Sequence, residues 1–154
     1  MDISVELDEA KSYGDIFSLV KRAVKNELGL HRMGLMLYLG NLPMKVGAFH
    51  PMGTNDIVLN RRLFNQNRKE TKFHIFTTLL HEYLHSLGIK DEREVRSLVY
   101  QICRDNFPKG HPIHYSAKSG PWADMDYQDL NDFHLDLDLE LVRDFEQIDI
   151  GYII

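Results

Sequence analysis

The sequence is poor in cysteine and contains no long apolar run. Cys103 is the only cysteine among 154 residues, so the chain has no second thiol for an internal disulfide, a redox pair or a cysteine zinc knuckle. No apolar stretch approaches the roughly 18 residues that cross a bilayer. The first ten residues, MDISVELDEA, are acidic, whereas a signal peptide begins with basic and then apolar residues. We therefore expect a soluble, cytoplasmic protein with no membrane partner.

The overall composition is that of an ordinary folded domain. Hydrophobic residues make up 44% of the chain and charged residues 27%, values close to the averages of soluble globular proteins. This balance excludes a disordered, collagen-like or coiled-coil protein. A chain of this length can bury a sizeable core without disulfides, and we expect one domain over residues 1–154.

Charge is distributed unevenly along the chain. Residues 122–154 hold eight Asp, two Glu and the single basic residue Arg143, so this segment carries −9 and residues 1–121 carry +4 of the total of −5. The one basic stretch, Arg61–Lys72, is short and interrupted by Asn, Gln and Phe. We interpret it as a solvated loop and the start of a helix, and nucleic acid is not an expected partner.

Hydrophobic periodicity predicts helices and short strands in an α+β arrangement. Apolar residues recur at helical spacing over Asp15–Leu28 and Lys72–Leu87, and each of these runs is followed by a glycine. A further helix should begin after a cap at Lys90 or Asp91. Strand-like segments precede the second of these helices; they are Met33–Leu39, Val46–Phe49 and Asp56–Leu59.

The C-terminal third gives weaker signals. Residues 107–122 contain three prolines and two glycines, which favours an irregular loop. Residues 134–141 alternate between apolar and polar, as a strand does. The alternating apolar residues of 148–154 favour a structural strand beside the similarly alternating Ile3, Val5 and Leu7. The alternative is a regulatory tail that lies across the active-site cleft.

The most informative residues are His81, Glu82 and His85, which spell HExxH within the expected helix Lys72–Leu87. Four residues are about one helical turn, so the two imidazoles project from one face and can bind the same metal ion. Glu82 then flanks the position of a metal-bound water. A zinc ion with three protein ligands activates its water, and the carboxylate can carry the proton to a leaving amine. The pattern therefore predicts peptide hydrolysis.

Together with Gly88 and Asp91, these residues form HExxHxxGxxD, which resembles the extended signature of the metzincins within the zincin metallopeptidases. The resemblance implies a zincin-like domain with a small twisted sheet and an active-site helix. It also implies that the glycine allows a sharp turn and that Asp91 is the third zinc ligand. In small zincins an extended substrate pairs with an exposed edge strand before this helix, and Asp56–Asn60 is the expected strand. Met125 is the one downstream methionine for the turn that metzincins place beneath the metal.

The residues alone leave the third ligand open. Glu92, Glu94, His111 and His114 are the alternatives to Asp91. Glu92 starts an apolar-patterned helix, which is similar to the glutamate helix of the gluzincin branch. Asp91 could equally serve only as a helix N-cap. A histidine of the 107–122 loop, or the Tyr115 hydroxyl, could instead stabilise an oxyanion.

From these patterns we expect a zinc metallopeptidase in which His81, His85 and Asp91 hold Zn²⁺ and Glu82 is the general base. Its partner would be a peptide or protein substrate. Two other classes stay open. One is a metal-dependent endoribonuclease, since the histidine spacing is similar to that of small bacterial enzymes of ribosomal RNA maturation, which normally lack the glutamate after the first histidine. The other is a catalytically idle zinc-binding interaction module.

Overall fold

The structure of the chain is a computed structural model that describes residues 2–64, 68–119 and 137–146. In these ranges the chain forms five helices and four strands in the order α1 (Ile3–Glu9), α2 (Tyr13–Leu28), β1 (Met36–Gly40), β2 (Ala48–Phe49), β3 (Asp56–Asn60), α3 (Lys69–Ser86), α4 (Glu92–Asn106), α5 (Ile113–Ser119) and β4 (Glu140–Leu141). Among the described residues, no helix combines the length and apolar character needed to span a bilayer.

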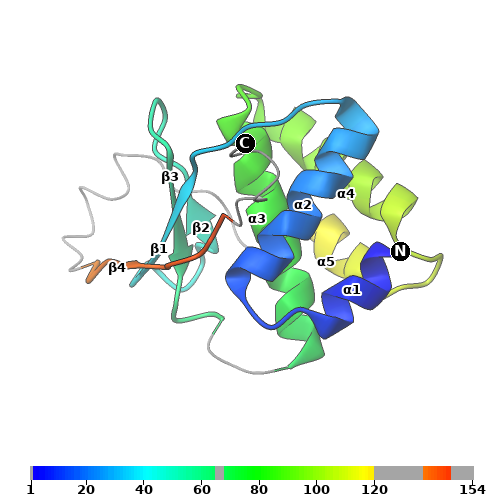
Figure 1. Ribbon diagram of the computed structural model, residues 1–154, viewed down its shortest axis with the longest axis horizontal. Helices are drawn as coiled ribbons and strands as arrows, with labels where there is room; N and C mark the ends of the chain where they lie inside the picture. The colour runs from blue at the N-terminus through cyan, green and yellow to red at the C-terminus, as the bar shows by residue number, and fades with distance from the viewer. Residues whose placement is uncertain (1, 65–67, 120–136, 147–154) are drawn as a thin grey trace, which may run out of the picture.

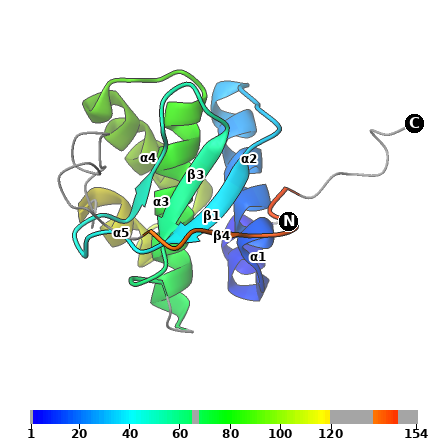
Figure 2. The same ribbon diagram turned by 90° about the vertical axis from the view of Figure 1, so that its left-hand side faces the viewer.

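The strands form one mixed sheet in the order β2-β3-β1-β4. β1 and β3 run parallel, whereas β2 and β4 pair antiparallel to their neighbours. The described helices gather on one face of this sheet (Figure 1). Figure 2 looks at the molecule from the sheet side, with the strands in front of α2 and α3. The predicted α+β class is therefore confirmed.

Helix α3 is the central element of the helical layer. It contacts α1, α2, α4, α5 and β2. Ten of its residues are buried, and they face several sides of the helix. Buried residues of the inner sheet face, Leu37, Ile57 and Leu59, join α2 and α3 in one hydrophobic core. Because α3 is enclosed on most sides, only a narrow part of its surface remains for a site.

Two predicted helices begin slightly earlier in the structure than the sequence indicates. α2 starts at Tyr13, because Ser12 is its N-cap and accepts a hydrogen bond from the Asp15 amide at 3.0 Å. It ends at Leu28 and is followed by the C-cap Gly29, which adopts the left-handed conformation with φ of 68°. α3 starts at Lys69 rather than Lys72.

The N-terminal segment in which Ile3, Val5 and Leu7 alternate with polar residues is the helix α1, so the strand prediction there is wrong. Asp2 caps α1 by accepting from the Ser4 amide. Ile3 and Leu7 lie four residues apart and are both buried, while Val5 is 47% exposed. This short pattern satisfies the helical period as well as the strand period, and the cap decides between them.

The 107–122 loop prediction is wrong over α5. Its prolines and glycines lie at the flanks, and the segment between Pro112 and Gly120 forms the helix. Of the strand expected over residues 134–141, the structure describes 137–141, and within this range the strand is the two residues of β4. Residues 148–154 and Met125 lie outside the described residues.

Candidate metal centre

The two histidines of the HExxH pattern lie on the same face of α3, near its C-terminal end. His81 and His85 are one turn apart, and their ring centroids are 5.0 Å from each other. Their side chains are 15% and 16% exposed. The helix thus presents two imidazoles at the edge of a buried surface, where solvent still reaches them.

A sharp turn follows these histidines. α3 ends at Ser86, and Gly88 adopts a positive φ of 99°. Asp91 then caps α4, whose first residue is Glu92. The expectation that Gly88 permits a sharp turn is confirmed, because residues other than glycine rarely adopt this backbone conformation.

The turn places Glu92 against both imidazoles. Its Oε1 lies 2.8 Å from Nε2 of His81 and 3.0 Å from Nε2 of His85. Ligand atoms of these three residues lie within 4.8 Å of one another. Two imidazoles and a carboxylate form a donor set that zinc accepts.

Asp91, the residue that the signature resemblance implied as third ligand, faces elsewhere. Its side chain accepts a hydrogen bond from the Arg93 amide at 3.0 Å and so serves as the N-cap of α4. The structure therefore brings Glu92, and not Asp91, into the cluster with the two histidines. The reason is local, because the new helix needs a cap at Asp91 and its first turn then directs Glu92 back toward α3.

A second layer of contacts fixes the orientation of these side chains. Nδ1 of His85 lies 2.9 Å from the Ile89 carbonyl oxygen. That oxygen can only accept, so the Nδ1 of His85 must donate. In Glu92, the other carboxylate oxygen, Oε2, accepts from Nε of Arg96 at 3.0 Å. Such outer contacts hold metal ligands in place in many metalloproteins.

This arrangement fits a cation between the three side chains. A neutral His85 that donates from Nδ1 has only a lone pair at Nε2, which faces an oxygen of Glu92 at 3.0 Å. Two lone pairs at this distance repel each other unless a proton or a cation lies between them. A metal ion would accept both lone pairs at once. It is compatible with the tautomer of His85 that donates from Nδ1 to the Ile89 carbonyl oxygen.

Glu82, the expected general base, lies beside the first histidine on α3 and is only 2% exposed. This burial shields its carboxylate from bulk solvent. Cys103 takes no part in this chemistry: it is buried on α4, and burial raises the pKa of its thiol to about 12.

Arg32 is a residue near the site that the sequence did not single out. Its guanidinium donates to the carbonyl oxygen of Ser86, directly after the HExxH segment, and to Thr54 and Asn55 in the β2–β3 turn. Its backbone amide donates to the hydroxyl of the buried Tyr83 at 2.9 Å. Arg32 therefore ties the end of α3 to the sheet. Its sequence neighbourhood carries no motif, so only the fold reveals this contact.

The remaining proposed site residues lie elsewhere. His111 packs against Phe73 in the N-terminal part of α3, with ring centroids 5.0 Å apart. The Nε2 of His114 faces the Pro108 carbonyl at 2.9 Å. Tyr115 is 77% exposed. Among the described residues, the metal-type cluster contains His81, His85 and Glu92, without His111, His114 or Glu94.

The expected substrate strand also differs from the prediction. Asp56–Asn60 is β3, which lies inside the sheet between β2 and β1 and has four buried residues. It is not an edge strand, because β1 pairs with it along its whole length and β2 pairs with Val58 and Leu59 on the other side. Within the described sheet, the edge that contacts α3 belongs to β2.

Comparisons of the chain with protein-family models, with curated proteins and with solved structures find no match. The resemblance to the metzincins therefore rests on the signature residues alone. What the structure adds is a His-His-Glu group that could hold a metal ion.

Proposed function

We propose that this protein is a zinc-dependent metallopeptidase whose metal ligands are His81, His85 and Glu92. The convergence of two Nε2 atoms and one carboxylate oxygen within 4.8 Å is the observation that carries this proposal. A glutamate from the following helix, rather than Asp91, makes the arrangement more similar to the gluzincin branch than to the metzincins.

The chemistry follows from the division of roles among these side chains. His81, His85 and Glu92 would hold the zinc ion, which would supply a Lewis acid that lowers the pKa of the attacking water toward neutrality. Glu82 accepts a proton from the attacking water on its carboxylate and returns it to the leaving nitrogen of the peptide. His85 and Glu92 are held in orientation by Ile89 and Arg96, which limits their motion during turnover.

An extended peptide is the substrate that the fold favours. β2 is a sheet edge in contact with the helix that carries the histidines. In the proposed binding mode an extended peptide adds beside this edge as a further strand. In this arrangement β2 takes the role that the sequence had suggested for Asp56–Asn60.

The test is to incubate the zinc-loaded protein with a quenched fluorescent casein and, separately, with a labelled RNA. We expect cleavage of the protein substrate only. The Glu82→Gln variant should lose at least about a hundredfold in kcat/KM and still bind one zinc, because imidazoles bind the metal and the carboxylate moves protons. Glu94→Gln is the matched control: it removes an exposed glutamate of α4 and should keep full activity.

Three results would contradict the proposal. Cleavage of RNA without cleavage of casein would support the endoribonuclease class. Zinc binding without any cleavage would support an idle module. Full activity in Glu82→Gln would show that another group acts as the base.

A further inference from the structure

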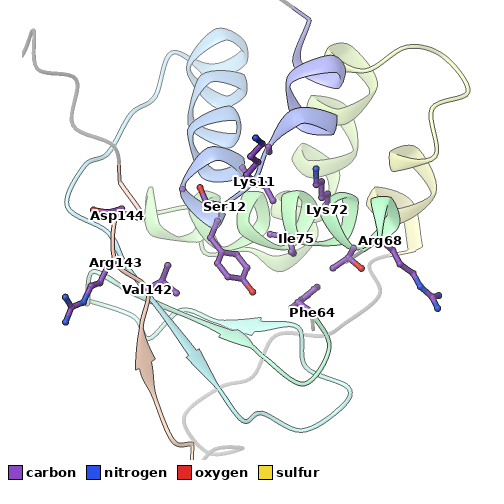
Figure 3. A pocket seen from close by; sticks show the side chains of 14 residues that line it. Lys11, Ser12, Phe64, Arg68, Lys72, Ile75, Val142, Arg143 and Asp144 are labelled. Carbon is purple, nitrogen blue, oxygen red and sulfur yellow. The ribbon is translucent and has the colours of Figure 1, made fainter. Parts of the chain in front are cut away.

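A cavity lies at the opposite end of α3 from the histidines. It has a volume of about 840 Å³ and lies between the start of α2, the first turns of α3 and the chain that follows β4. Figure 3 shows it from close by, with Lys72 and Ile75 on α3 and Val142 on the segment across from them. Volumes between about 300 and 1,000 Å³ are typical of small-molecule sites.

This cavity is separate from the candidate metal centre. Its residues at the start of α3 are the N-cap Arg68 and Thr71, Lys72 and Ile75; the last of these is six residues before His81, about 9 Å of helix at a rise of about 1.5 Å per residue. Its other wall follows β4, which forms the opposite edge of the sheet from β2. A ligand in this cavity would therefore touch neither the cluster nor the edge proposed for the peptide.

The charge around the cavity is opposite in sign to that of the whole chain. Four cationic residues and one acidic residue, Asp144, belong to its lining, although the chain carries a net charge of −5; the cationic residues are Lys11, Arg68, Lys72 and Arg143. In the part of the chain that the structure describes, none of the four forms an ion pair. The ammonium group of Lys72 donates to the Asp8 carbonyl oxygen at 2.8 Å.

The interior differs in character from this cationic rim. Ile16, Phe64, Ile75 and Val142 supply apolar surface, and Ser12, Tyr13 and Thr71 supply hydroxyl groups. The side chains of Arg68 and Arg143 extend outward on opposite sides of the opening (Figure 3). The two guanidinium groups therefore lie to either side of the cavity and away from its apolar residues.

The wall beside the entrance is closely packed. Gly14 approaches the segment after β4 so closely that an added Cβ would lie 2.4 Å from the Asp144 carbonyl oxygen. The chain can come this near only because the residue is glycine. The start of α2 and the segment after β4 are thus in close contact at this wall.

We propose that this cavity binds a small organic anion, a phosphate or carboxylate joined to an apolar body. The apolar part enters against Phe64, Ile75 and Val142. The anionic group stays toward solvent, where the positive charge of the four lining cations, which form no ion pair among the described residues, attracts it. This proposal does not depend on the metal centre, since no residue is shared between the two sites.

The probe for this proposal is 1-naphthyl phosphate, measured by isothermal titration calorimetry on the full chain. Two control ligands are measured in the same way. The neutral 1-naphthol lacks the anionic group, and inorganic phosphate lacks the apolar body. We expect saturable 1:1 binding of the naphthyl phosphate, at least about tenfold tighter than binding of either control. Binding should weaken as ionic strength rises from about 0.05 to about 0.5 M, because the attraction is partly screened.

Variants test the position of the site. Thr71→Glu adds a negative charge to the lining in the first turn of α3, where an acidic residue favours the helix, so the fold should persist while affinity falls at least about tenfold. The Arg68→Gln/Arg143→Gln double variant should also weaken binding. The matched control, Lys45→Gln/Lys118→Gln, removes two exposed cations outside the lining and should bind like the parent.

Several outcomes would overturn the proposal. These are no saturable binding of 1-naphthyl phosphate, equal binding of 1-naphthol, equal weakening in the control double variant, or unchanged binding in Thr71→Glu. Casein cleavage in the same preparation reports on the metal centre alone, so the two proposals can fail independently.

Discussion

At the scale of single residues, the neighbours Asp91 and Glu92 divide two tasks that the sequence alone does not separate. Asp91 accepts from a backbone amide and starts α4, whereas Glu92 faces two imidazoles. An acidic pair at a helix start offers both a cap and a ligand. Only the direction of the first helical turn decides which residue does which.

This division predicts opposite effects of two alanine substitutions. Asp91→Ala should lower the free energy of unfolding by about 1 kcal/mol, as the loss of an N-cap does, and leave zinc affinity nearly unchanged. Glu92→Ala should weaken zinc binding by at least about tenfold, because it removes one of three ligands. Competition with a chromophoric chelator measures affinity, and urea unfolding measures stability. Loss of zinc in Asp91→Ala with retention in Glu92→Ala would show the reverse assignment.

His111 provides a prediction about pH. Burial lowers the pKa of its imidazole, and carboxylates such as that of Asp8 partly oppose this shift. Its Nδ1 also accepts from the Ile113 amide at 3.0 Å, which requires an unprotonated nitrogen. Because the pKa is lower in the folded state than in the unfolded chain, the unfolded chain binds the proton first, and stability falls as pH decreases below about 6.5.

The measurement is the free energy of unfolding between about pH 7.5 and about pH 5.5, with a chelator present to remove metal effects. In His111→Gln the decrease toward low pH should be smaller than in the parent. His31→Gln removes an imidazole from an exposed loop position and serves as the control. An identical slope in His111→Gln and the parent would contradict the lowered pKa.

At the scale of elements, the turn between α3 and α4 determines the geometry of the cluster. Gly88, at a φ of 99°, reverses the chain so that the first residue of α4 faces the last turns of α3. The short interval between His85 and Glu92 leaves little freedom for another path. The precision of the site therefore depends on one backbone conformation.

Replacement of this glycine should disturb the site as well as the fold. Gly88→Ala forces a side chain into the left-handed region, at a cost of about 1 to 3 kcal/mol in the free energy of unfolding. Relaxation of that strain would move Glu92, so zinc affinity should fall too. Gly110→Ala is a matched control, since Gly110 also has a positive φ, 84°, but precedes α5. It should lose stability without loss of zinc affinity.

The elements also show what the sequence could and could not predict. The HExxH helix and its glycine stop were predictable because helical period, stop signal and motif agree over a long segment. α1 was mistaken for a strand because three alternating residues fit both periods. The position of β3 inside the sheet was not predictable, since strand order depends on long-range pairing and not on local pattern. Arg32 acts through contacts to residues more than 20 positions away, which no local signal reveals.

At the scale of the whole molecule, the segment after β4 joins the sheet to the helical layer. The Val142 amide donates to the Leu37 carbonyl, and Phe145 stacks on Phe17 of α2 with ring centroids 4.2 Å apart. The carboxylate of Glu146 accepts from the amides of Gly34 and Leu35. Residues distant in sequence thus close the core beside the cavity that Ile75 and Val142 line.

Phe145 should therefore contribute strongly to stability. Phe145→Ala removes a side chain of a residue that is 3% exposed and should cost about 3 to 5 kcal/mol of unfolding free energy. Leu141→Ala, in the neighbouring β4 and 44% exposed, should cost far less. Urea unfolding of both variants tests the comparison. Equal, small losses would show that the segment after β4 is not part of the core.

The central claim is that two imidazoles and the Glu92 carboxylate hold one zinc ion. Its most direct test is the zinc K-edge X-ray absorption spectrum of the stoichiometric zinc complex. We expect a nitrogen and oxygen shell near about 2.0 to 2.1 Å, two imidazoles in the multiple-scattering region, and a change in the shell in Glu92→Ala. A spectrum with three imidazoles, with sulfur, or with no imidazole would contradict the account.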